Sequence, residues 1–248
     1  MEIIWEIQES EIIQIKEFIR LNDNPVVKRR FDRNIKRQSV QIDKDSITRN
    51  LLMCLLTSQQ RSGPTSRITY FFKQKPFPLT FQNIEREDNI EVFVRTILKQ
   101  NGLTRYINKI PRFFVANLNH VQKTKWEIID TLKSIDCMAN KTIERKIADE
   151  IDDTFVGFGP KQSRNFLQSI GVTKYEIPID SRITKWLNDF GFPVTLSSSA
   201  LQDKGYYHFV SDGIQELCNR AEIYPCILDA AIFSSFDKSQ WTEENTIY

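Results

Sequence analysis

Apolar side chains recur every three or four residues along most of the chain, which is the spacing of one face of an α-helix. Ile12, Ile15 and Ile19 follow this spacing near the start of the chain. A more apolar stretch begins at Ser46, and we expect it to form a helix at the centre of the core. Only the first nine residues suggest a strand. The pattern therefore predicts an all-α protein.

Two helical patterns in the middle of the chain allow more detailed expectations. The first, near residues 88–100, places Val92, Phe93 and Ile97 on its buried face, with Leu98 as a further candidate. The second contains Pro111, whose ring and missing N–H interrupt the interior of a helix. We expect that helix to kink at Pro111 or to begin afresh there.

A third pattern predicts two helices joined by a tight turn. Residues 155–182 read FVGFGPKQSRNFLQSIGVTKYEIPIDSR, and a helical pattern also precedes them. Gly157 and Gly159 suit the turn, Pro160 suits the first position of the second helix, and Gly171 suits its end. Such a hairpin directs free backbone amides outward. Because amides at a helix N-terminus bind phosphate oxygens, this turn is a candidate phosphate site.

Two ionisable residues stand at the starts of consecutive helices in this stretch. Lys161 lies directly behind the turn, and Asp180 is placed to cap the next helix, so both can face one cleft. A Gly-x-Gly before a lysine also occurs in the phosphate-binding loops of nucleotide hydrolases. Here no glycine directly precedes Lys161 and no strand-like run leads into it, which argues against such a loop.

Composition adds little to this picture but removes some classes of protein. The chain has 248 residues, of which 40% are hydrophobic and 27% charged, as in ordinary globular proteins. No run approaches the length of a membrane span, and acids stand near the start where a signal peptide has basic residues. We therefore expect an intracellular protein with no membrane partner. Its four cysteines form no close CxxC pair and are expected to be reduced and buried.

Charge is distributed unevenly along the chain. The net charge of +2 is too small to indicate nucleic-acid binding by itself. Residues 28–37, KRRFDRNIKR, nevertheless hold six basic residues against the single acid Asp32. This run is either a solvated helix face or a contact to a DNA backbone.

The motif GFGPKQS followed by PIDSR resembles the helix-hairpin-helix DNA glycosylase superfamily. Within it, the motif is most similar to the branch of 8-oxoguanine DNA glycosylase/AP lyases, and closest to the archaeal-type second family. The resemblance covers residues 51–236, whereas residues 1–40 have no counterpart. It implies that Lys161 is the catalytic nucleophile and that Asp180 is the acid that supports it.

The resemblance also implies how the chain is divided and which cofactors it needs. It predicts a terminal helical subdomain of residues 1–45 and 175–248, a central one of residues 46–174 with its hairpin at 155–161, and a cleft between them. Some relatives carry a four-cysteine iron-sulfur cluster near the C-terminus. Only Cys218 and Cys226 lie in that region here, so we expect no cluster, no metal and no other cofactor.

Further residues are implied to bind DNA. The amides of Gly157 and Gly159, together with Gln162 and Arg182, would hold the backbone of one strand. By position, Gln59 would fill the hole left when a nucleotide is flipped out, with Gln60 beside it. The alternatives are that Arg182 is an ordinary surface arginine and that both glutamines sit at a solvated helix end.

The base pocket is predicted from Asp229 and Phe233, which are four residues apart and so share one face of a helix begun by Pro225. In the resembled branch, this helix brings a polar residue to the edge of the base and an aromatic ring to its face. A carboxylate accepts hydrogen bonds only, which matches the N1–H and amino donors of a guanine-type base. The alternative is a surface aspartate beside a core phenylalanine.

The expected function is excision of 8-oxoguanine from duplex DNA, with strand cleavage through a lysine Schiff base and β-elimination. We expect a monomer whose partner is double-stranded DNA with an oxidised base. Burial and the helix N-terminus should lower the pKa of Lys161, and Asp180 should raise it. The alternatives are a glycosylase for alkylated bases and a non-catalytic DNA-binding protein with the same hairpin.

Overall fold

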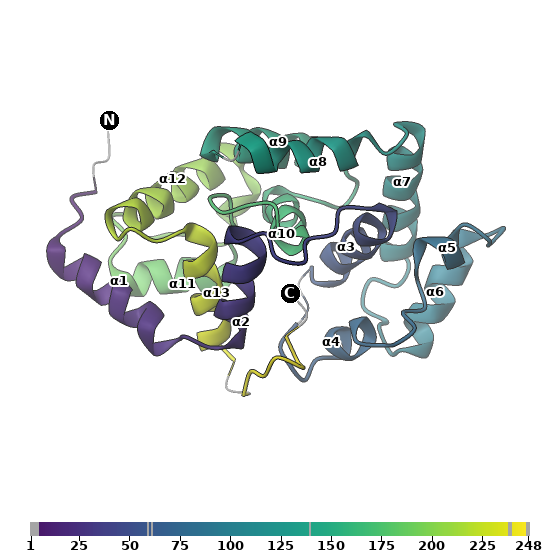
Figure 1. Cartoon of the computed structure of the whole chain (residues 1–248), viewed down its shortest axis with the longest axis horizontal. Coiled ribbons are helices and arrows are strands. Elements are labelled where there is room, and N and C mark those ends of the chain that lie inside the picture. Colours follow the sequence, from purple (N-terminus) through teal and green to yellow (C-terminus); the bar gives the residue numbers. More distant parts are fainter. Residues whose placement is uncertain (1–4, 59, 61, 139, 238–239, 247–248) are drawn as a thin grey trace.

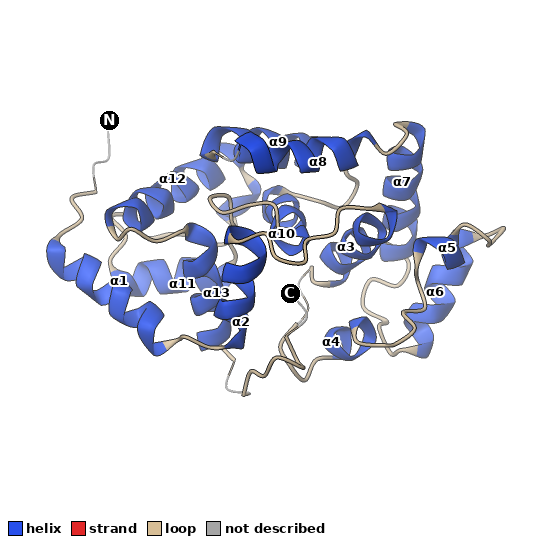
Figure 2. Ribbon diagram, in the orientation of Figure 1, coloured by secondary structure: helices blue, strands red, loops and turns tan. Residues whose placement is uncertain are grey.

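The computed structural model describes the chain apart from residues 1–4, 59, 61, 139, 238–239 and 247–248. Every regular element in the described part is helical, which confirms the all-α prediction (Figures 1 and 2). None of these helices combines the length and apolarity that a membrane crossing requires. Residues 5–8 form no strand. The α-helices are α1 (Glu9–Leu21), α2 (Pro25–Arg30), α3 (Lys44–Leu56), α4 (Arg67–Phe72), α5 (Phe81–Ile84), α6 (Ile90–Gln100), α7 (Ile110–Lys123), α8 (Glu127–Met138), α9 (Lys141–Thr154), α10 (Pro160–Ile170), α11 (Ser181–Phe190), α12 (Lys204–Arg220) and α13 (Pro225–Ser235).

The buried apolar side chains form two clusters. The central cluster takes its members from residues 47–172, and α3 runs through it with Leu51 and Leu56 fully buried. The terminal cluster combines residues 7–27 with residues 177–241. Figure 1 shows α1, α2 and α11–α13 on one side and α3–α7 on the other. The start and the end of the described chain thus pack together, while the middle packs on itself.

Helix α6 corrects one expectation, and α7 confirms another. Val92 is 55% exposed, so its predicted burial is wrong, whereas Val94 and Leu98 are fully buried. The stretch IEVFVRTIL carries apolar residues on more than one helical face, and packing against α7 selects the face of Val94. Helix α7 begins at Ile110, with Pro111 in its first turn, as the missing N–H of proline requires.

The basic run also differs from both expectations, because several of its side chains point inward. It forms the end of α2 and a π-helical turn, Phe31–Ile35. Arg33 donates to the carbonyl of Ser169 (2.8 Å), and Arg37 donates to that of Val172 (3.0 Å). These carbonyls lie at and beyond the C-terminal end of α10, where a helix leaves acceptors unpaired and carries partial negative charge. Burial lowers the pKa of Arg33 to about 10, and nearby arginines add to this. These two arginines therefore hold α10 in place.

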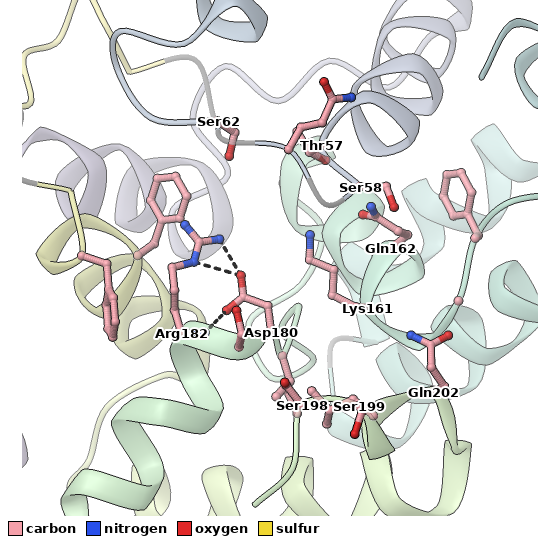
Figure 3. A pocket seen from close by; sticks show the side chains of 18 of the residues that line it. Thr57, Ser58, Ser62, Lys161, Gln162, Asp180, Arg182, Ser198, Ser199 and Gln202 are labelled. Atoms are coloured by element: carbon pink, nitrogen blue, oxygen red, sulfur yellow. Dashed lines mark hydrogen bonds and ion pairs between the residues drawn. The ribbon is translucent and has the colours of Figure 1, made fainter. Parts of the chain in front are cut away.

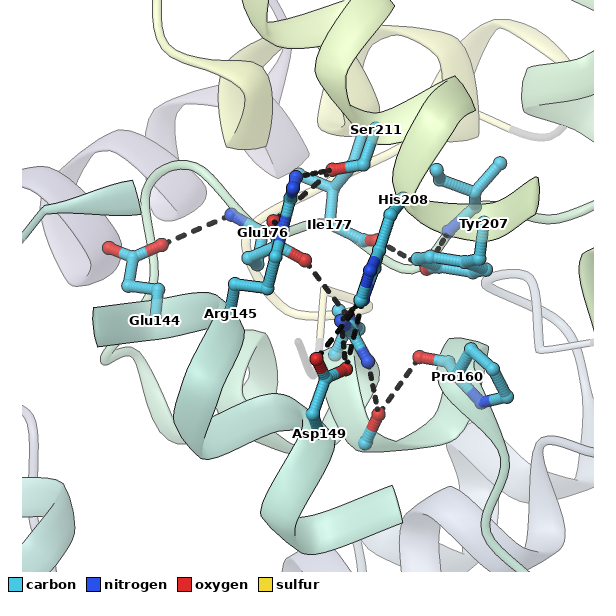
Figure 4. A network of polar contacts seen from close by, with 12 residues as sticks. Glu144, Arg145, Asp149, Pro160, Glu176, Ile177, Tyr207, His208 and Ser211 are labelled. Carbon is cyan, nitrogen blue, oxygen red and sulfur yellow. Dashed lines mark hydrogen bonds and ion pairs between the residues drawn. The ribbon is translucent and has the colours of Figure 1, made fainter. Parts of the chain in front are cut away.

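A buried polar network joins α9, α10 and α12 (Figure 4). Arg164 of α10 has a fully buried side chain, and its Nε donates to Glu176 (3.0 Å). Its Nη2 donates to Asp149 of α9 (2.7 Å), which also contacts His208 of α12 (3.1 Å). On the other side, Arg145 of α9 donates to Glu176 (2.9 Å). The helix that carries Lys161 is thereby fixed to its neighbours.

Candidate active site

The hairpin between α9 and α10 has the predicted form. Pro160 is the first residue of α10, and Gly171 ends it in the left-handed conformation (φ 98°). Gly157 also has positive φ (81°), and a Cβ there would lie 2.4 Å from the ring of Phe113, so the turn requires glycine at this position. The side-chain amide of Asn117 accepts from the N–H of Val156 (2.7 Å) and donates to its carbonyl (3.0 Å). The tip of the hairpin is therefore held in one conformation.

Asp180 caps α11, as predicted, and also binds Arg182. Its Oδ1 accepts from the backbone N–H groups of Arg182 (2.8 Å) and Ile183 (3.3 Å). Its Oδ2 accepts from Nε (2.9 Å) and Nη2 (2.5 Å) of the Arg182 side chain. Burial opposes ionisation here, but the charge and hydrogen bonds of Arg182 hold the pKa of Asp180 below its ordinary value.

Lys161 lies in the first turn of α10 and shares one space with Asp180 (Figure 3). Burial lowers the pKa of Lys161, and the nearby charge of Asp180 opposes this shift, as expected. Within the described chain, the Lys161 ammonium forms no ion pair and no hydrogen bond. The lysine is therefore available to react, and its protonated form is disfavoured.

Lys161 and Asp180 lie in a cleft of about 980 Å³. Its walls come from residues of both hydrophobic clusters, and Figure 3 shows the segment after α3 facing the loop before α12 across the lysine. Among the described lining residues, most polar side chains are hydroxyls or amides: Thr57, Ser58, Gln60, Ser62, Gln162, Ser181, Ser198, Ser199 and Gln202. The predicted Gly157, Gly159 and Arg182 line the same cleft.

Of the two glutamines that were predicted to contact DNA after α3, the structure describes only Gln60. Gln60 lines the cleft, and its Nε2 donates to the carbonyl of Leu56 (2.7 Å). Gln59 lies outside the described residues, so its role as the stack-filling residue stays a prediction. Gln162 is buried, and its Oε1 accepts from Asn165 (3.3 Å).

Behind Lys161 the cleft continues into an inner cavity of about 40 Å³. Asp229 lines it from α13, which begins at Pro225 as predicted. Asp229 is only 6% exposed, so the alternative of a surface aspartate is wrong. Its Oδ2 accepts from Gln168 (2.7 Å) and from the buried Arg30 (3.3 Å). Burial raises the pKa of Asp229, and the charge of Arg30 opposes this rise.

Phe233 lies one turn beyond Asp229 and also lines the cleft. The guanidinium of Arg182 lies over its ring, 4.5 Å from the centroid, and Trp241 packs against the ring at 5.4 Å. Arg182 thus joins Asp180 to Phe233. Arg182 was predicted either to contact a phosphate or to be an ordinary surface arginine. Neither prediction included its position between Asp180 and Phe233.

Arg30 and Gln168 were not predicted as site residues. Arg30 was one of six basic residues in a run, and Gln168 was a polar position in an amphipathic pattern. For Gln168 the sequence gives one signal, because apolar residues stand on either side of it at Leu167 and Ile170, which suggests burial. Arg30 has no such signal. Which cavity they would line depends on how α2, α10 and α13 pack.

Comparison with known proteins rests on structure alone, because no protein-family model and no curated protein matches the sequence. The 8-oxoguanine DNA glycosylase of Methanocaldococcus jannaschii superposes with a TM-score of 0.66 at 17% identity, over 94% of this chain and 98% of that one. The 8-oxoguanine DNA glycosylase of Thermotoga maritima gives a TM-score of 0.66 at 14% identity, over 93% and 98%. The chain has the fold of these two glycosylases. At such identities the likeness concerns the fold alone.

Proposed function

We propose that this protein is a DNA glycosylase that excises 8-oxoguanine from duplex DNA and then cleaves the strand through Lys161. The observation that carries the proposal is the pairing of two residues in one cleft. Lys161 has a pKa lowered by burial, and Asp180 has one held low by Arg182. The shared fold with two proteins named as 8-oxoguanine DNA glycosylases adds support.

The reaction begins with a nucleotide flipped out of the duplex, because a stacked base is out of reach. The neutral amine of Lys161 attacks C1′ of the sugar, and the C1′–N9 bond breaks with its electron pair leaving on the base, which takes up a proton. Opening of the sugar ring gives an imine between Lys161 and C1′. Loss of a proton from C2′ then expels the 3′ phosphate by β-elimination.

Asp180 has a role at the moment when the base leaves. Positive charge develops on the sugar, and a carboxylate that is already ionised and oriented stabilises that charge without rearrangement. The contacts of Asp180 with the start of α11 and with Arg182 supply this orientation. Its carboxylate therefore serves the transition state more than the bound substrate.

We also assign roles to the surrounding cleft. The hairpin amides, Gln162 and the hydroxyl-rich walls would hold the lesion strand, with Gln60 near the vacated stack. We assign residues 46–174 and residues 1–45 with 175–248 to two subdomains on either side of the cleft, a division that the central and terminal clusters support. The protein acts as a monomer on double-stranded DNA and is found with the DNA inside the cell.

The alternatives make different demands on the site. A non-catalytic DNA-binding protein has no need of a buried lysine with a lowered pKa. A glycosylase for alkylated bases favours an apolar pocket, whereas the inner cavity here is lined by a carboxylate, an amide and a guanidinium. The first observation favours an enzyme, and the second favours a guanine-derived lesion.

The deciding experiment is reduction with borohydride in the presence of a duplex that contains 8-oxoguanine. The wild-type protein should become covalently attached to the lesion strand, and a duplex with undamaged guanine is the control. Lys161→Gln should lose both base release and trapping while it still binds the duplex. An adduct formed by Lys161→Gln at the wild-type rate would show that another residue is the nucleophile. Wild-type protein that binds the duplex but neither excises nor traps would support the non-catalytic alternative.

A further inference from the structure

Gln168 is a buried glutamine whose amide nitrogen has a hydrogen-bond partner, whereas its amide oxygen has none among the described residues. The side chain lines the inner cavity, the residue is 3% exposed, and its Nε2 donates to Oδ2 of Asp229 (2.7 Å). Its Oε1 is buried and has no hydrogen-bond partner among the described residues. The amide cannot simply be turned around, because Oδ2 of Asp229 also accepts from Arg30 and needs a donor from Gln168. Gln168 therefore keeps an oxygen acceptor unused.

A second unused acceptor is Oδ1 of Asp229, a residue that lines the same cavity as Gln168. Its Oδ2 is used by Gln168 and Arg30, while its Oδ1 accepts no hydrogen bond from the described residues. The buried, unpaired Oε1 of Gln168 is unfavourable, and a ligand with a matching donor recovers that free energy. Two acceptors on neighbouring side chains match a ligand that presents two adjacent donors.

An unused amide oxygen is not by itself the mark of a binding site, as Gln215 shows. Its Nε2 donates to Glu176 (3.0 Å), and its buried Oε1 likewise has no partner within the described chain. Gln215, however, lies in the polar network of α12 and lines neither the cleft nor the inner cavity. What distinguishes Gln168 is that it faces the cavity next to Lys161.

We propose that Gln168 determines which base the site accepts, by taking a hydrogen bond on Oε1 from the 2-amino group of a guanine-type base while Oδ1 of Asp229 takes the N1–H. This inference rests on the proposed function and names the feature of the base that is read. The inner cavity, at about 40 Å³, has room for the donor edge alone. The body of the base lies in the adjoining cleft, which shares Lys161, Asp180 and Phe233 with the cavity.

The 2-amino group can be tested separately from the rest of the lesion. 8-Oxohypoxanthine keeps the N1–H and the 8-oxo group of 8-oxoguanine and lacks only the amine. Single-turnover excision is measured from duplexes with either lesion opposite cytosine. The weaker pairing of the hypoxanthine lesion affects every protein variant alike, so the quantity compared is the ratio of the two rates for each variant.

Wild-type protein should excise 8-oxoguanine about 10- to 100-fold faster than 8-oxohypoxanthine, the range expected for one buried hydrogen bond. Gln168→Leu should bring this ratio close to one, mainly by slowing the 8-oxoguanine reaction. Gln215→Leu is the matched control and should keep the wild-type ratio. Gln168→Met, whose side chain has a similar length, is the second variant in case leucine disturbs the packing. Affinity for a duplex with a tetrahydrofuran abasic analogue, which has no base to read, should be the same for all four proteins.

Each other outcome decides against the inference in a recognisable way. A wild-type ratio in both Gln168 variants overturns the role of Gln168 and leaves the proposed function intact. An equal fall of the ratio in Gln215→Leu shows a general effect on packing and also overturns it. Wild-type protein that excises neither lesion overturns the proposed function, and this inference with it.

Discussion

Asp180 accepts hydrogen bonds from the backbone at the start of α11 and from the side chain of Arg182. Substitution by asparagine separates its capping role from its negative charge. Asp180→Asn keeps an oxygen that can cap α11, because asparagine is as good a capping residue as aspartate. It loses the charge that faces Lys161. We therefore expect base excision to slow by about 100-fold or more, with little change in DNA affinity. The melting temperature should fall modestly, because the pairing of Oδ2 with Arg182 is weakened. The measurement is single-turnover excision of 8-oxoguanine.

The control for this substitution is Asp43→Asn. Asp43 caps α3 through the N–H of Ser46 (2.8 Å) and lies outside the cleft. Its excision rate should equal that of the wild type. Near-normal excision by Asp180→Asn would remove Asp180 from the proposed mechanism.

Lys161 and Asp180 together determine how the reaction depends on pH. The neutral amine of Lys161 is the reactive form, so trapping should rise with pH and level off above the lowered pKa of Lys161, below the ordinary lysine value of about 10.4. Asp180 raises that pKa, and Asp180→Asn should therefore move the rising limb to lower pH. The trapping rate measured against pH tests this. A limb that stays in place or moves to higher pH would mean that Asp180 does not raise the pKa of Lys161.

A site residue can be predicted from the sequence when its role depends on residues that are close to it in the chain. Gly157, Pro160 and Asp180 are recognisable because the turn, the helix start and the cap are each set by neighbours in the chain. Arg30 and Gln168 could not be recognised, because their role arises only where distant helices meet around Asp229.

At the scale of elements, α9 holds the loop that leads to Asp180. Glu144 of α9 is fully buried, and its carboxylate accepts from the N–H groups of Lys174 (3.0 Å), Tyr175 (2.8 Å) and Glu176 (3.1 Å). The carboxylate of Glu144 thus accepts from the backbone of three successive residues, and Figure 4 shows Glu144 beside Glu176. The loop between α10 and α11 depends on it for its conformation.

Glu144→Ala leaves the N–H groups of Lys174 and Tyr175 without their acceptor, and that of Glu176 with Thr173 Oγ1 alone (3.2 Å). We expect it to lower the free energy of unfolding by about 3 kcal/mol. Glu144→Gln keeps one oxygen and should lose less. Urea unfolding measures both, and Glu150→Ala is the control, because Glu150 is exposed on the same helix. Equal stability of Glu144→Ala and the control would mean that the loop between α10 and α11 keeps its conformation without Glu144.

Helices were easier to predict than the faces they bury. The start of α7 follows from proline chemistry, which acts within one turn. The buried face of α6 depends on its partner, since Val92 and Val94 have similar side chains and only packing distinguishes them. The inward course of Arg33 and Arg37 is likewise invisible in a run of like charges, because it depends on where α10 ends.

At the scale of the whole molecule, the cleft is polar but carries little charge. Among its described lining residues the cations are Lys161 and Arg182, and Arg182 is already paired with Asp180. The affinity for duplex DNA should therefore depend weakly on salt, with a slope of log K against log salt of about −2 to −3, since each neutralised phosphate contributes about −0.9. Fluorescence anisotropy between about 50 and 200 mM salt measures the slope.

Arg37→Gln tests the inward arginines in the same assay. Since its side chain binds the backbone beyond α10, the substitution should lower stability and leave the salt slope unchanged. A wild-type slope steeper than about −6 would show that the basic run lies on the DNA after all.

The division of the chain at residues 45/46 and 174/175 stays a prediction that the two hydrophobic clusters support. It was inferred from the resemblance, since the helical periodicity is the same in both halves. Periodicity shows that a helix buries one face and does not show which other helices that face meets.

The terminal cluster is closed by segments from both ends of the described chain, and this has a mechanical consequence. If force is applied between Glu9 and Gln240, we expect the terminal cluster to unfold first and residues 47–172 to remain folded as an intermediate, because both pulled positions belong to segments that close the terminal cluster. Refolding should run in the opposite order. The central cluster closes over shorter loops and returns early, whereas the terminal cluster has to bring residues 7–27 back to residues 177–241 across the whole intervening chain.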